Sequence, residues 1–426
     1  MSRESGCEGR LSERIRILYV VQGIIPNTGP GRHLFKLMAY RNKATVDVEV
    51  FAFDVCDPAM MNELARDHGV RATVLGGSFT SPRTYLRGWP ALRRRIREFR
   101  PHVIQTHHTP IVDWVARVAG RWAGVPLNLS RAVSQPRTYH LSRRGRLAWW
   151  FTRLGDTVTR PLVDYYLPNS ADVATYLADV EGVPPRKIVT IGNGIDTDLF
   201  QPSAELRQAG RQQLGLAADD LLIVTVGILK EHKGQRYLVE AAARLMSRLS
   251  GLRVALVGAP MSAEDEVYAA ELRERVSVLG MAEHFMFLGM RADVRPVLAA
   301  ADIYAHPSLH EGSSNAVLEA MAMGCACVVS DVTGCPELVD QGRAGLVVLQ
   351  RDIPALTAAL DSLLGDGFRR QALGAEARQR AEQVYGVRRM CAECEAVARR
   401  GLREKGVDPS NGEGMAPRDG AARARR

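Results

Sequence analysis

Residues 306–328 read HPSLHEGSSNAVLEAMAMGCACV and place a loop of glycine and serine between a short apolar strand and a helix. A helix that starts at such a loop has unpaired backbone N–H groups and about half a positive charge at its first turn. A diphosphate fits this kind of helix start. The pattern therefore predicts a phosphate site at Gly312 and Ser313. Glu319, one to two turns into the helix, is placed to accept hydrogen bonds from ribose hydroxyls, and Glu311 lies near a sugar beyond the phosphates.

A second segment, VGILKEHKGQRYLVEAAARL at residues 226–245, has the same order of strand, loop and helix. The strand ends at Gly227 and the helix begins near Gly234, so Lys233 lies directly before the helix. A charge-assisted hydrogen bond contributes about 1.5–3 kcal/mol, and a cation beside a departing phosphate stabilises the negative charge that develops there. We therefore expect Lys233 to bind the phosphates, with Lys230 as a weaker candidate.

Strands and helices alternate along most of the chain, which predicts parallel sheets covered by helices on both faces. In the first half we expect strands at residues 15–21, 46–53, 102–106, 165–168 and 188–191, and helices at residues 32–40, 85–99, 111–120 and 170–177. Residues 200–220 are polar and irregular, as in a linker. After them we expect strands at residues 221–226, 253–257, 285–288 and 303–305, a helix from residue 234, and further helices between residues 353 and 400.

This alternation predicts an α/β fold with two Rossmann-like domains, and 426 residues are enough for two hydrophobic cores. We assign residues 14–200 to the first domain and residues 201–385 to the second. Residues 386–400 are expected to form a C-terminal helix. Residues 401–426 are rich in Gly, Pro and Arg and are expected to be a disordered tail.

The composition, 46% hydrophobic and 24% charged residues, is that of a soluble globular protein. The chain has no apolar run of the roughly 18 residues that a membrane span needs, and its start lacks the apolar core of a secretory signal. We therefore expect a cytoplasmic protein. Residues 1–170 contain 26 Lys and Arg against 13 Asp and Glu, so an anionic partner or surface is expected for the first half. Nucleic acid is not expected, because the aromatic platform motifs of such proteins are missing.

Of the seven cysteines, Cys391 and Cys394 have the spacing of a metal or redox pair. A zinc site needs a second pair and a redox site needs a thioredoxin-like context, and neither is evident. We interpret these two as structural, and Cys325, Cys327 and Cys335 as reduced and partly buried.

These segments resemble glycosyltransferase family 4. Glu311 to Glu319 is similar to the family's E-x7-E motif, and Gly227 to Gly234 is similar to its G-x5-K-G segment. The looser segments YLPNSADVATYL, IVTIGNGIDTDLFQP and GCPELVDQGRAGLVV also look like the family, so the resemblance covers nearly all of residues 14 to 390. It implies a GT-B fold, in which two Rossmann-like domains, acceptor-binding and nucleotide-sugar-binding, face each other across a donor-binding cleft.

The resemblance also implies roles for individual residues. Glu319 would bind the donor ribose, Glu311 would face the donor sugar and Lys233 would bind the diphosphate. The donor site would further include Gly29, Gly31, Lys230, Gly312, Ser313 and Ser314. His107, with His108 beside it, matches a histidine that the family places after a strand near the sugar. Two departures stand out: Ile228 occupies a position where many members have Arg, and the loop TGPGRH is shorter than the usual version, so that Arg32 and His33 are either acceptor contacts or helix-start residues.

The implied reaction moves a hexose-type sugar from a nucleotide-diphosphate sugar to an acceptor hydroxyl with retention of configuration. Glu311, His107 and Lys233 would be the catalytic residues, acting by position and charge, with no metal and no cofactor besides the nucleotide-sugar co-substrate. The acceptor is expected to be a saccharide or a lipid-linked saccharide of cell-envelope glycan synthesis. A nucleotide-sugar epimerase of the same fold and a non-catalytic partner subunit of a transferase are the alternatives.

Residues 137–160 combine arginines with Trp149, Trp150 and Phe151, which is the composition of an interfacial basic-aromatic helix. One interpretation is peripheral contact with an anionic membrane at the inner face of the cell membrane. The other is that the aromatic side chains pack into the domain and the arginines are solvated.

Overall fold

The computed structural model describes residues 14–25, 29–77, 82–107, 109–133, 153–246 and 248–409. The chain divides into two compact units, one made of Met1–Gly192 and Arg388–Arg426 and the other of Asn193–Val387. The division lies eight residues before the expected one. Residues 193–200 belong to the second unit because Ile195 pairs with Gly386 and the Arg378 guanidinium donates to the carbonyls of Thr197 and Phe200.

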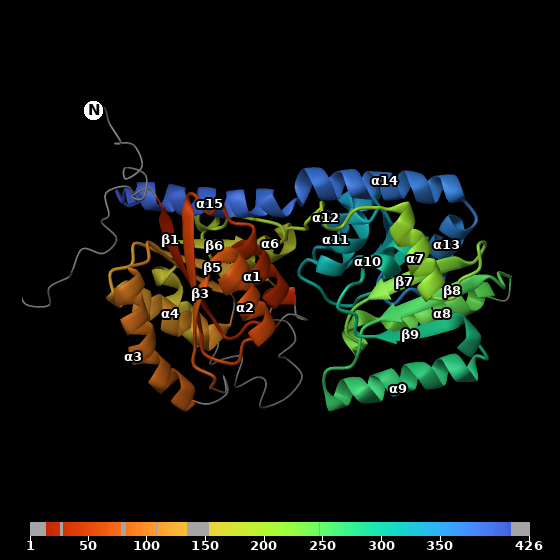
Figure 1. Cartoon of the computed structure of the whole chain (residues 1–426), viewed down its shortest axis with the longest axis horizontal. Coiled ribbons are helices and arrows are strands. Elements are labelled where there is room, and N and C mark those ends of the chain that lie inside the picture. The colour runs from red at the N-terminus through yellow and green to blue at the C-terminus, as the bar shows by residue number, and fades with distance from the viewer. Residues whose placement is uncertain are drawn as a thin grey trace, which may run out of the picture. The chain divides into compact units, whose positions relative to one another are not determined.

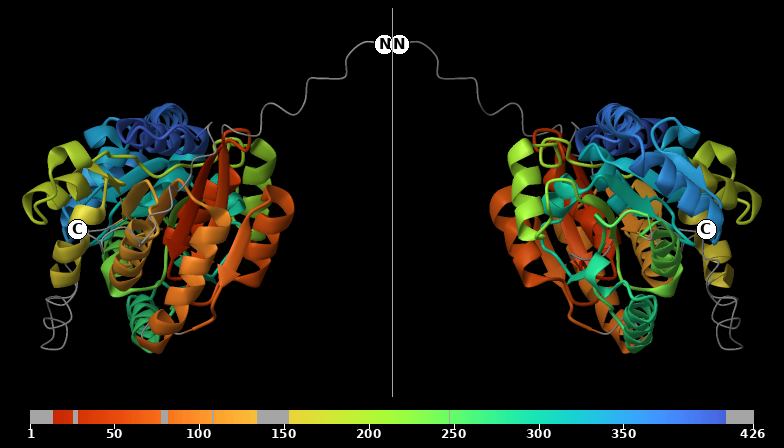
Figure 2. Two further views of the ribbon diagram at one scale, coloured as in Figure 1. Left: turned by 90° about the vertical axis from the view of Figure 1, so that its left-hand side faces the viewer. Right: turned by 90° about the vertical axis from the view of Figure 1, so that its right-hand side faces the viewer.

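The first unit contains a six-stranded parallel sheet in the order β3-β2-β1-β4-β5-β6, with helices on both faces (Figures 1 and 2). Its strands are β1 (Ile15–Val21), β2 (Val46–Ala52), β3 (Arg71–Val74), β4 (Val103–His107), β5 (Leu127–Ala132) and β6 (Tyr165–Pro168). Its helices are α1 (Gly29–Ala39), α2 (Pro58–His68), α3 (Pro82–Phe99), α4 (Pro110–Trp122) and α6 (Ala171–Asp179), with short 3₁₀ turns at Arg160–Leu162 and Pro185–Lys187. The core between β1, β2 and the helices α3 and α4 includes Leu18, Phe51 and Ile96.

The second unit repeats this arrangement in the order β12-β11-β10-β7-β8-β9 (Figure 1). Its strands are β7 (Leu221–Val226), β8 (Leu252–Val257), β9 (Phe285–Gly289), β10 (Ile303–His306), β11 (Ala326–Ser330) and β12 (Leu346–Val348). Its helices are α7 (Ala204–Gln213), α8 (Gln235–Met246), α9 (Ala263–Val278), α10 (Arg295–Ala300), α11 (Asn315–Ala322), α12 (Cys335–Leu338), α13 (Ile353–Leu364) and α14 (Gly367–Val384), with 3₁₀ turns at Glu231–Lys233, Ala282–His284 and Asp340–Gly342. Counted along the chain, both sheets have the strand order of a Rossmann fold.

The last helix, α15 (Val387–Glu404), follows the second unit in the chain but lies almost wholly within the first. Near its C-terminal end, Glu404 accepts a hydrogen bond from the Tyr165 hydroxyl, and the side chain of Leu402 is buried. The expected helix at 386–400 is therefore present but longer, and the prediction of a tail from residue 401 was wrong for its first residues. Residues 410–426 lie outside the described residues.

Among the expectations about local structure, those for residues 188–191 and for residues 200–220 were wrong. Residues 188–191 form no strand, since only a single bridge joins Ile188 to Tyr166. Residues 200–220 contain a helix, α7, which Ser203 caps by accepting a hydrogen bond from the backbone N–H of Leu206. Cys391 and Cys394 are buried in α15, and burial raises the pKa of the Cys391 thiol to about 12.

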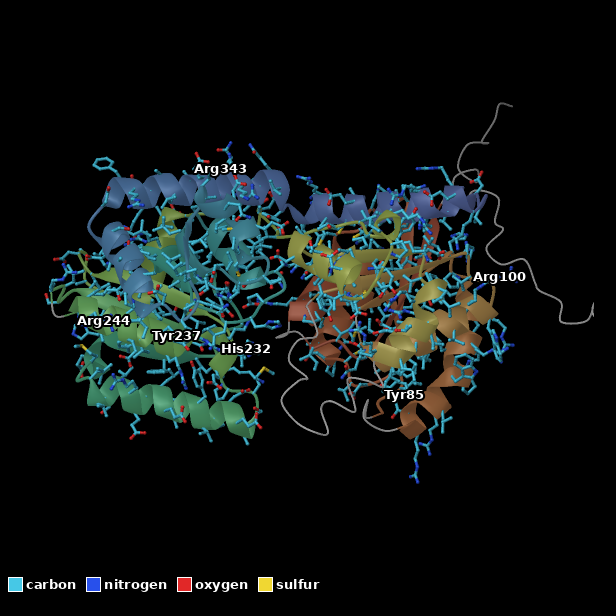
Figure 3. All side chains as sticks on the ribbon, turned by 180° about the vertical axis from the view of Figure 1, so that it is seen from behind. Tyr85, Arg100, His232, Tyr237, Arg244 and Arg343 are labelled. Atoms are coloured by element: carbon cyan, nitrogen blue, oxygen red, sulfur yellow. The ribbon has the colours of Figure 1, made fainter. Side chains whose placement is uncertain are left out.

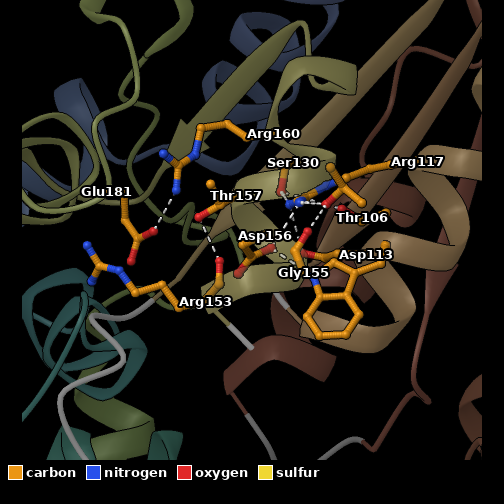
Figure 4. Close-up of polar contacts among 12 residues, drawn as sticks. Thr106, Asp113, Arg117, Ser130, Arg153, Gly155, Asp156, Thr157, Arg160 and Glu181 are labelled. Carbon is orange, nitrogen blue, oxygen red and sulfur yellow. Dashed lines mark hydrogen bonds and ion pairs between the residues drawn. The ribbon is translucent and has the colours of Figure 1, made fainter. Parts of the chain in front are cut away.

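A buried ion-pair network fixes residues 153–162 in the first unit (Figure 4). The Arg117 guanidinium on α4 donates to Asp156 at 2.9 Å, to the Thr159 hydroxyl at 3.0 Å and to the Ser130 hydroxyl at 3.1 Å. Arg153 donates to the carbonyl of Val180 at 2.9 Å. The described end of the basic-aromatic segment is therefore attached to the domain, while residues 137–152 lie outside the described residues. Within the described ranges, no helix has both the length and the apolar character that crossing a membrane requires.

Candidate functional site

The candidate donor site of the second unit lies where two neighbouring parallel strands end. β7 and β10 pair side by side, so the loops that follow them leave the same edge of the sheet. The helices that follow these two strands cover opposite faces of a Rossmann sheet, and ligands bind at such a switch point. Both motif segments identified in the sequence, residues 226–234 and 306–314, meet at this edge.

The turn that presents Lys233 is fastened to the loop after β10. The His232 carbonyl accepts hydrogen bonds from the Leu309 N–H at 2.7 Å and from the Ser308 hydroxyl at 3.0 Å. Gly234 has a φ of 68°, and a Cβ at this position would lie 1.9 Å from the Pro307 carbonyl oxygen. The close approach therefore requires glycine. Figure 3 labels His232, which lies within this turn, and Tyr237, which lies in the first turn of α8.

Three charged or polar side chains meet beside this turn. The Lys233 ammonium lies 2.6 Å from Oε1 of Glu311, and Nε2 of His306 lies 2.8 Å from the same oxygen. Burial alone would raise the pKa of Glu311, but the charge of Lys233 and the hydrogen bond from His306 outweigh it and hold the pKa well below its usual range. Glu311 is therefore an ionised, largely buried carboxylate held by two donors.

The helix start predicted to receive a diphosphate is formed by Ser314 and the first turn of α11. The helix begins at Asn315, later than expected, and the Ser314 hydroxyl caps it by accepting a hydrogen bond from the Val317 N–H. Oγ of Ser313 is buried and has no hydrogen-bond partner among the described residues. A buried polar atom of this kind is where a ligand or water is expected to bind. Gly312 is buried beside it.

Glu319 lies in the second turn of α11 and is only 2% exposed. Burial raises the pKa of the neighbouring Tyr304 hydroxyl well above its usual value, and the negative charges of Glu319 and Glu311 raise it further. Both motif glutamates therefore lie close to Tyr304, on the α11 side of the sheet.

Lys230 is not part of this cluster. Its ammonium lies 3.5 Å from Oδ1 of Asp265, a buried carboxylate in the first turn of α9. The side chain is 44% exposed. The structure therefore separates the two candidate lysines, with Lys233 at Glu311 and Lys230 at α9.

In the first unit, His107 is the last residue of β4 and has Arg131 as its register partner on β5. Its ring lies 5.8 Å from that of His33 and 5.9 Å from that of Tyr19, measured between centroids. Burial, together with the positive charge of Arg131, lowers the pKa of His107 to about 3. His107 is therefore neutral at physiological pH, and it is suited to hydrogen bonding rather than to carrying charge.

His33 completes this buried group. Neither of its ring nitrogens, nor Nδ1 of His107, has a hydrogen-bond partner among the residues that the structure describes. Gly29 and Gly31, expected in a loop, lie instead in the first turn of α1. His108 lies outside the described residues, so contacts are given for His107 alone.

Sequence reasoning missed several residues of these two groups. His306 and Tyr304 lie on one face of β10, and the two-residue alternation of a strand would have identified them as neighbours. Arg131 had no signal in the sequence, because a lone arginine is normally exposed. Here it is fully buried, and its guanidinium donates to the Ile191 carbonyl at 2.8 Å.

Comparison with known families matches both halves of the chain. Residues 27–199 match the model described as Glycosyltransferase Family 4, and residues 220–366 match the model described as Glycosyl transferases group 1. Both motif segments of the second unit lie within the second match.

Among curated relatives, the D-inositol 3-phosphate glycosyltransferase of Geodermatophilus obscurus is 30% identical over 290 residues, 66% of this chain and 62% of the relative. A GDP-mannose-dependent alpha-(1-6)-phosphatidylinositol monomannoside mannosyltransferase of Mycolicibacterium smegmatis is 33% identical over 227 residues, 49% of this chain and 57% of the relative. The chain spans less than two thirds of the length of the D-inositol 3-phosphate glycosyltransferases that it matches.

Among solved structures, HepE of Anabaena in complex with UDP superposes with a TM-score of 0.76 at 22% identity, over 91% of this chain and 100% of that chain. This likeness establishes the α/β fold with two Rossmann-like sheets as GT-B. The two family models cover residues 27–199 and 220–366, and they identify the chain as a glycosyltransferase made of a Glycosyltransferase Family 4 domain and a Glycosyl transferases group 1 domain.

Proposed function

We propose that this protein is a retaining glycosyltransferase that moves a hexose-type sugar from a nucleoside-diphosphate sugar to an acceptor hydroxyl. The observation that carries the proposal is the group formed by Lys233, Glu311 and His306 beside the capped start of α11. Fixed positive charge and a fixed carboxylate then lie together at the switch point of the second sheet. The UDP and UDP-glucose in crystal structures of HepE support a donor of this class.

In the proposed reaction the bond between the sugar's anomeric carbon and the diphosphate oxygen breaks. The acceptor hydroxyl forms the new bond on the same face and loses its proton to the leaving diphosphate or to solvent. Lys233 and the N–H groups at the start of α11 stabilise the charge that develops on the diphosphate. Glu311 positions the sugar, and neutral His107 contributes a hydrogen bond near it.

The acceptor that we propose is a saccharide or a lipid-linked saccharide. The names of the curated relatives refer to inositol phosphate and to phosphatidylinositol monomannoside, both of which carry several hydroxyls. The unpartnered ring nitrogens of His33 and His107 support an acceptor site at the carboxyl edge of the first sheet, because they are available to hydroxyl groups.

Replacing Glu319 with glutamine is expected to weaken donor binding about 10- to 150-fold, because a hydrogen bond to a charged group contributes about 1.5–3 kcal/mol. Thermal unfolding with UDP, GDP, ADP and their sugars measures this. A nucleotide at about 100 times its dissociation constant stabilises the native protein by about 2.7 kcal/mol. Glu376→Gln, at an exposed position of α14, is the control. Stabilisation by no nucleotide would contradict the proposed function, and equal affinity in both variants would contradict the role of Glu319.

Peripheral membrane contact through residues 137–160 is part of the proposal. In flotation experiments with vesicles containing phosphatidylglycerol, the protein is expected to rise with the lipid at low salt and to be released at high salt, because each surface arginine contributes about 1 kcal/mol. Replacing Arg143, Arg144 and Arg146 with glutamate should abolish flotation. Flotation that is equally strong in the variant would assign the membrane contact to another surface.

A further inference from the structure

Two aromatic side chains of β10 form a stacked pair, one member of which contacts Glu311. Tyr304 and His306 point to the same face of the sheet, their ring centroids are 6.1 Å apart and their planes differ by 16°. Tyr304 is fully buried and His306 is 3% exposed. β10 lies between β7 and β11, inside the sheet, so the position of this pair is set by strand pairing on both sides.

The hydrogen bonds of the pair indicate which ring nitrogen of His306 carries the proton. Nε2 of His306 lies 2.8 Å from Oε1 of Glu311, and the Tyr304 hydroxyl lies 3.3 Å from Nδ1 of His306. An ionised carboxylate only accepts hydrogen bonds, so Nε2 carries the proton. In the neutral ring, Nδ1 is then the acceptor that faces the Tyr304 hydroxyl, and it is nearer to that hydroxyl, at 3.3 Å, than the other available acceptor, the Val226 carbonyl oxygen at 3.5 Å. Tyr304 therefore favours the tautomer that donates to Glu311.

Lys233 and His306 hold the same oxygen of Glu311 in different ways. Both contact Oε1, whereas Oε2 makes no hydrogen bond with any residue that the structure describes. Lys233 has a flexible stem and a side chain that is 20% exposed, but the side chain of His306 is short and 4% exposed. If Lys233 turns towards a diphosphate, Glu311 loses one partner. A buried carboxylate without a partner is costly, so a second donor that does not move is needed.

We propose that His306, held in its tautomer by Tyr304, is a positioning residue that keeps the Glu311 carboxylate facing the donor sugar while Lys233 engages the diphosphate. This rests on the proposed function, because it takes Glu311 as the residue that contacts the sugar. His306 itself touches neither sugar nor phosphate in this arrangement. Its removal should therefore affect the sugar part of the donor and spare the nucleoside-diphosphate part.

The test is calorimetric titration of wild type and variants with UDP and UDP-glucose, and with GDP and GDP-mannose. His306→Leu is expected to lower affinity for the sugar nucleotide about tenfold and to change affinity for the matching nucleoside diphosphate less than about twofold. His306→Gln should restore most of the loss, because its amide nitrogen reaches the place of Nε2. His306→Asn, whose amide is one methylene shorter, should not. Equal losses for both ligands, or equal behaviour of Gln and Asn, would overturn the proposal.

A double-mutant comparison separates positioning from general structural damage. In a Glu311→Ala background, His306→Leu should cause no further loss of sugar-nucleotide affinity, because its target is gone. A further loss of the same size as in wild type would assign His306 a structural role and overturn the proposal. If wild type binds none of the four ligands, both the proposed function and the role of His306 are overturned. If wild type binds a sugar nucleotide and His306→Leu binds it equally well, only the role of His306 is overturned, and the proposed function stands.

The tautomer gives a readout that needs no ligand. In protein labelled with ¹⁵N-histidine, the His306 ring, assigned by its absence in His306→Gln, should carry its proton on Nε2. The Nδ1–H form should gain population in Tyr304→Phe. A wild-type ring protonated only on Nδ1 would overturn the proposal whatever the ligand results.

Discussion

Replacing Lys233 with alanine is expected to lower the turnover number about 100- to 1,000-fold with donor and acceptor saturating. Loss of one group that stabilises developing charge in a water-poor site typically has an effect of this size. Lys233 is the cation at Glu311 in the candidate donor site, where its Nζ lies 2.6 Å from Oε1 of that carboxylate. The start of α11 remains in the variant, so activity should fall without disappearing.

The measurement is steady-state kinetics with the donor identified by thermal unfolding. Lys405→Ala is a matched control, because Lys405 forms an ion pair of the same length, 2.6 Å, with Asp164 in the first unit. It should change turnover little, since exposed ion pairs contribute about 0–1 kcal/mol. A Lys233 variant with normal turnover and a raised KM would show that Lys233 binds donor and transition state equally, contrary to its proposed role.

Lys233→Ala should also alter the dependence of stability on pH. The pKa of Glu311 is held low in the folded protein, so this carboxylate contributes stability above its unfolded pKa of about 4.3, and the contribution is lost as pH falls. Without Lys233, the pKa of Glu311 should rise towards its usual range, because the effect of burial is then opposed mainly by the hydrogen bond from His306. The variant should therefore lose more stability than the control near neutral pH, and the difference should shrink in acid.

Replacing Gly234 with alanine is expected to destabilise the second unit by about 2–5 kcal/mol, or on the order of 10 °C in Tm. Two effects add up. A non-glycine residue at a φ of 68° is strained, and its Cβ would lie 1.9 Å from the Pro307 carbonyl oxygen, which forces the two loops apart. Because Lys233 and Glu311 come from these loops, donor binding should be lost together with stability.

Gly280→Ala isolates the backbone strain. Gly280 has a φ of 69°, and a Cβ there would meet nothing within 4 Å, so this variant should lose only about 1–2 kcal/mol. Thermal unfolding of both variants gives the comparison. Equal losses in the two would mean that the close approach to Pro307 is unimportant for the second unit.

Local patterns were sufficient where a strand is uniformly apolar and buried on both faces. Residues 15–21 were predicted as a strand and form β1, because every side chain of IRILYVV except Arg16 is buried in one sheet. Local patterns did not predict β5, whose sequence LNLSRA contains three polar residues that are nonetheless buried. The Arg131 guanidinium donates to a carbonyl 60 residues away. The side-chain amide of Asn128 donates to the Leu162 carbonyl, and its backbone N–H donates to the Asp164 carboxylate. Hydrogen-bond partners so distant in the chain cannot be predicted from the neighbouring sequence.

The helix α7 shows the same limit. Its sequence AELRQAGRQQ has little apolar character, and it contains a glycine that weakens a helix. Its stability comes from α10, where Arg207 binds the carbonyls of Ala299, Ala300 and Ala301. Gly210 also lies so close to the carbonyl of Pro296 that a Cβ would meet it at 2.0 Å. A packing contact, rather than helix propensity, therefore decides this element.

The sequence by itself determined the two-sheet α/β class and the two motif segments of the second unit, because both follow from short-range periodicity and from glycine at loop positions. Only the tertiary structure decided that Lys233 and Glu311 share one hydrogen bond across 78 residues, that His306 holds the same oxygen, and that Lys230 turns away to Asp265. The physical reason is that parallel strand pairing brings the ends of β7 and β10 to one edge. The direction of each side chain there is then set by burial and hydrogen bonding that no local pattern encodes.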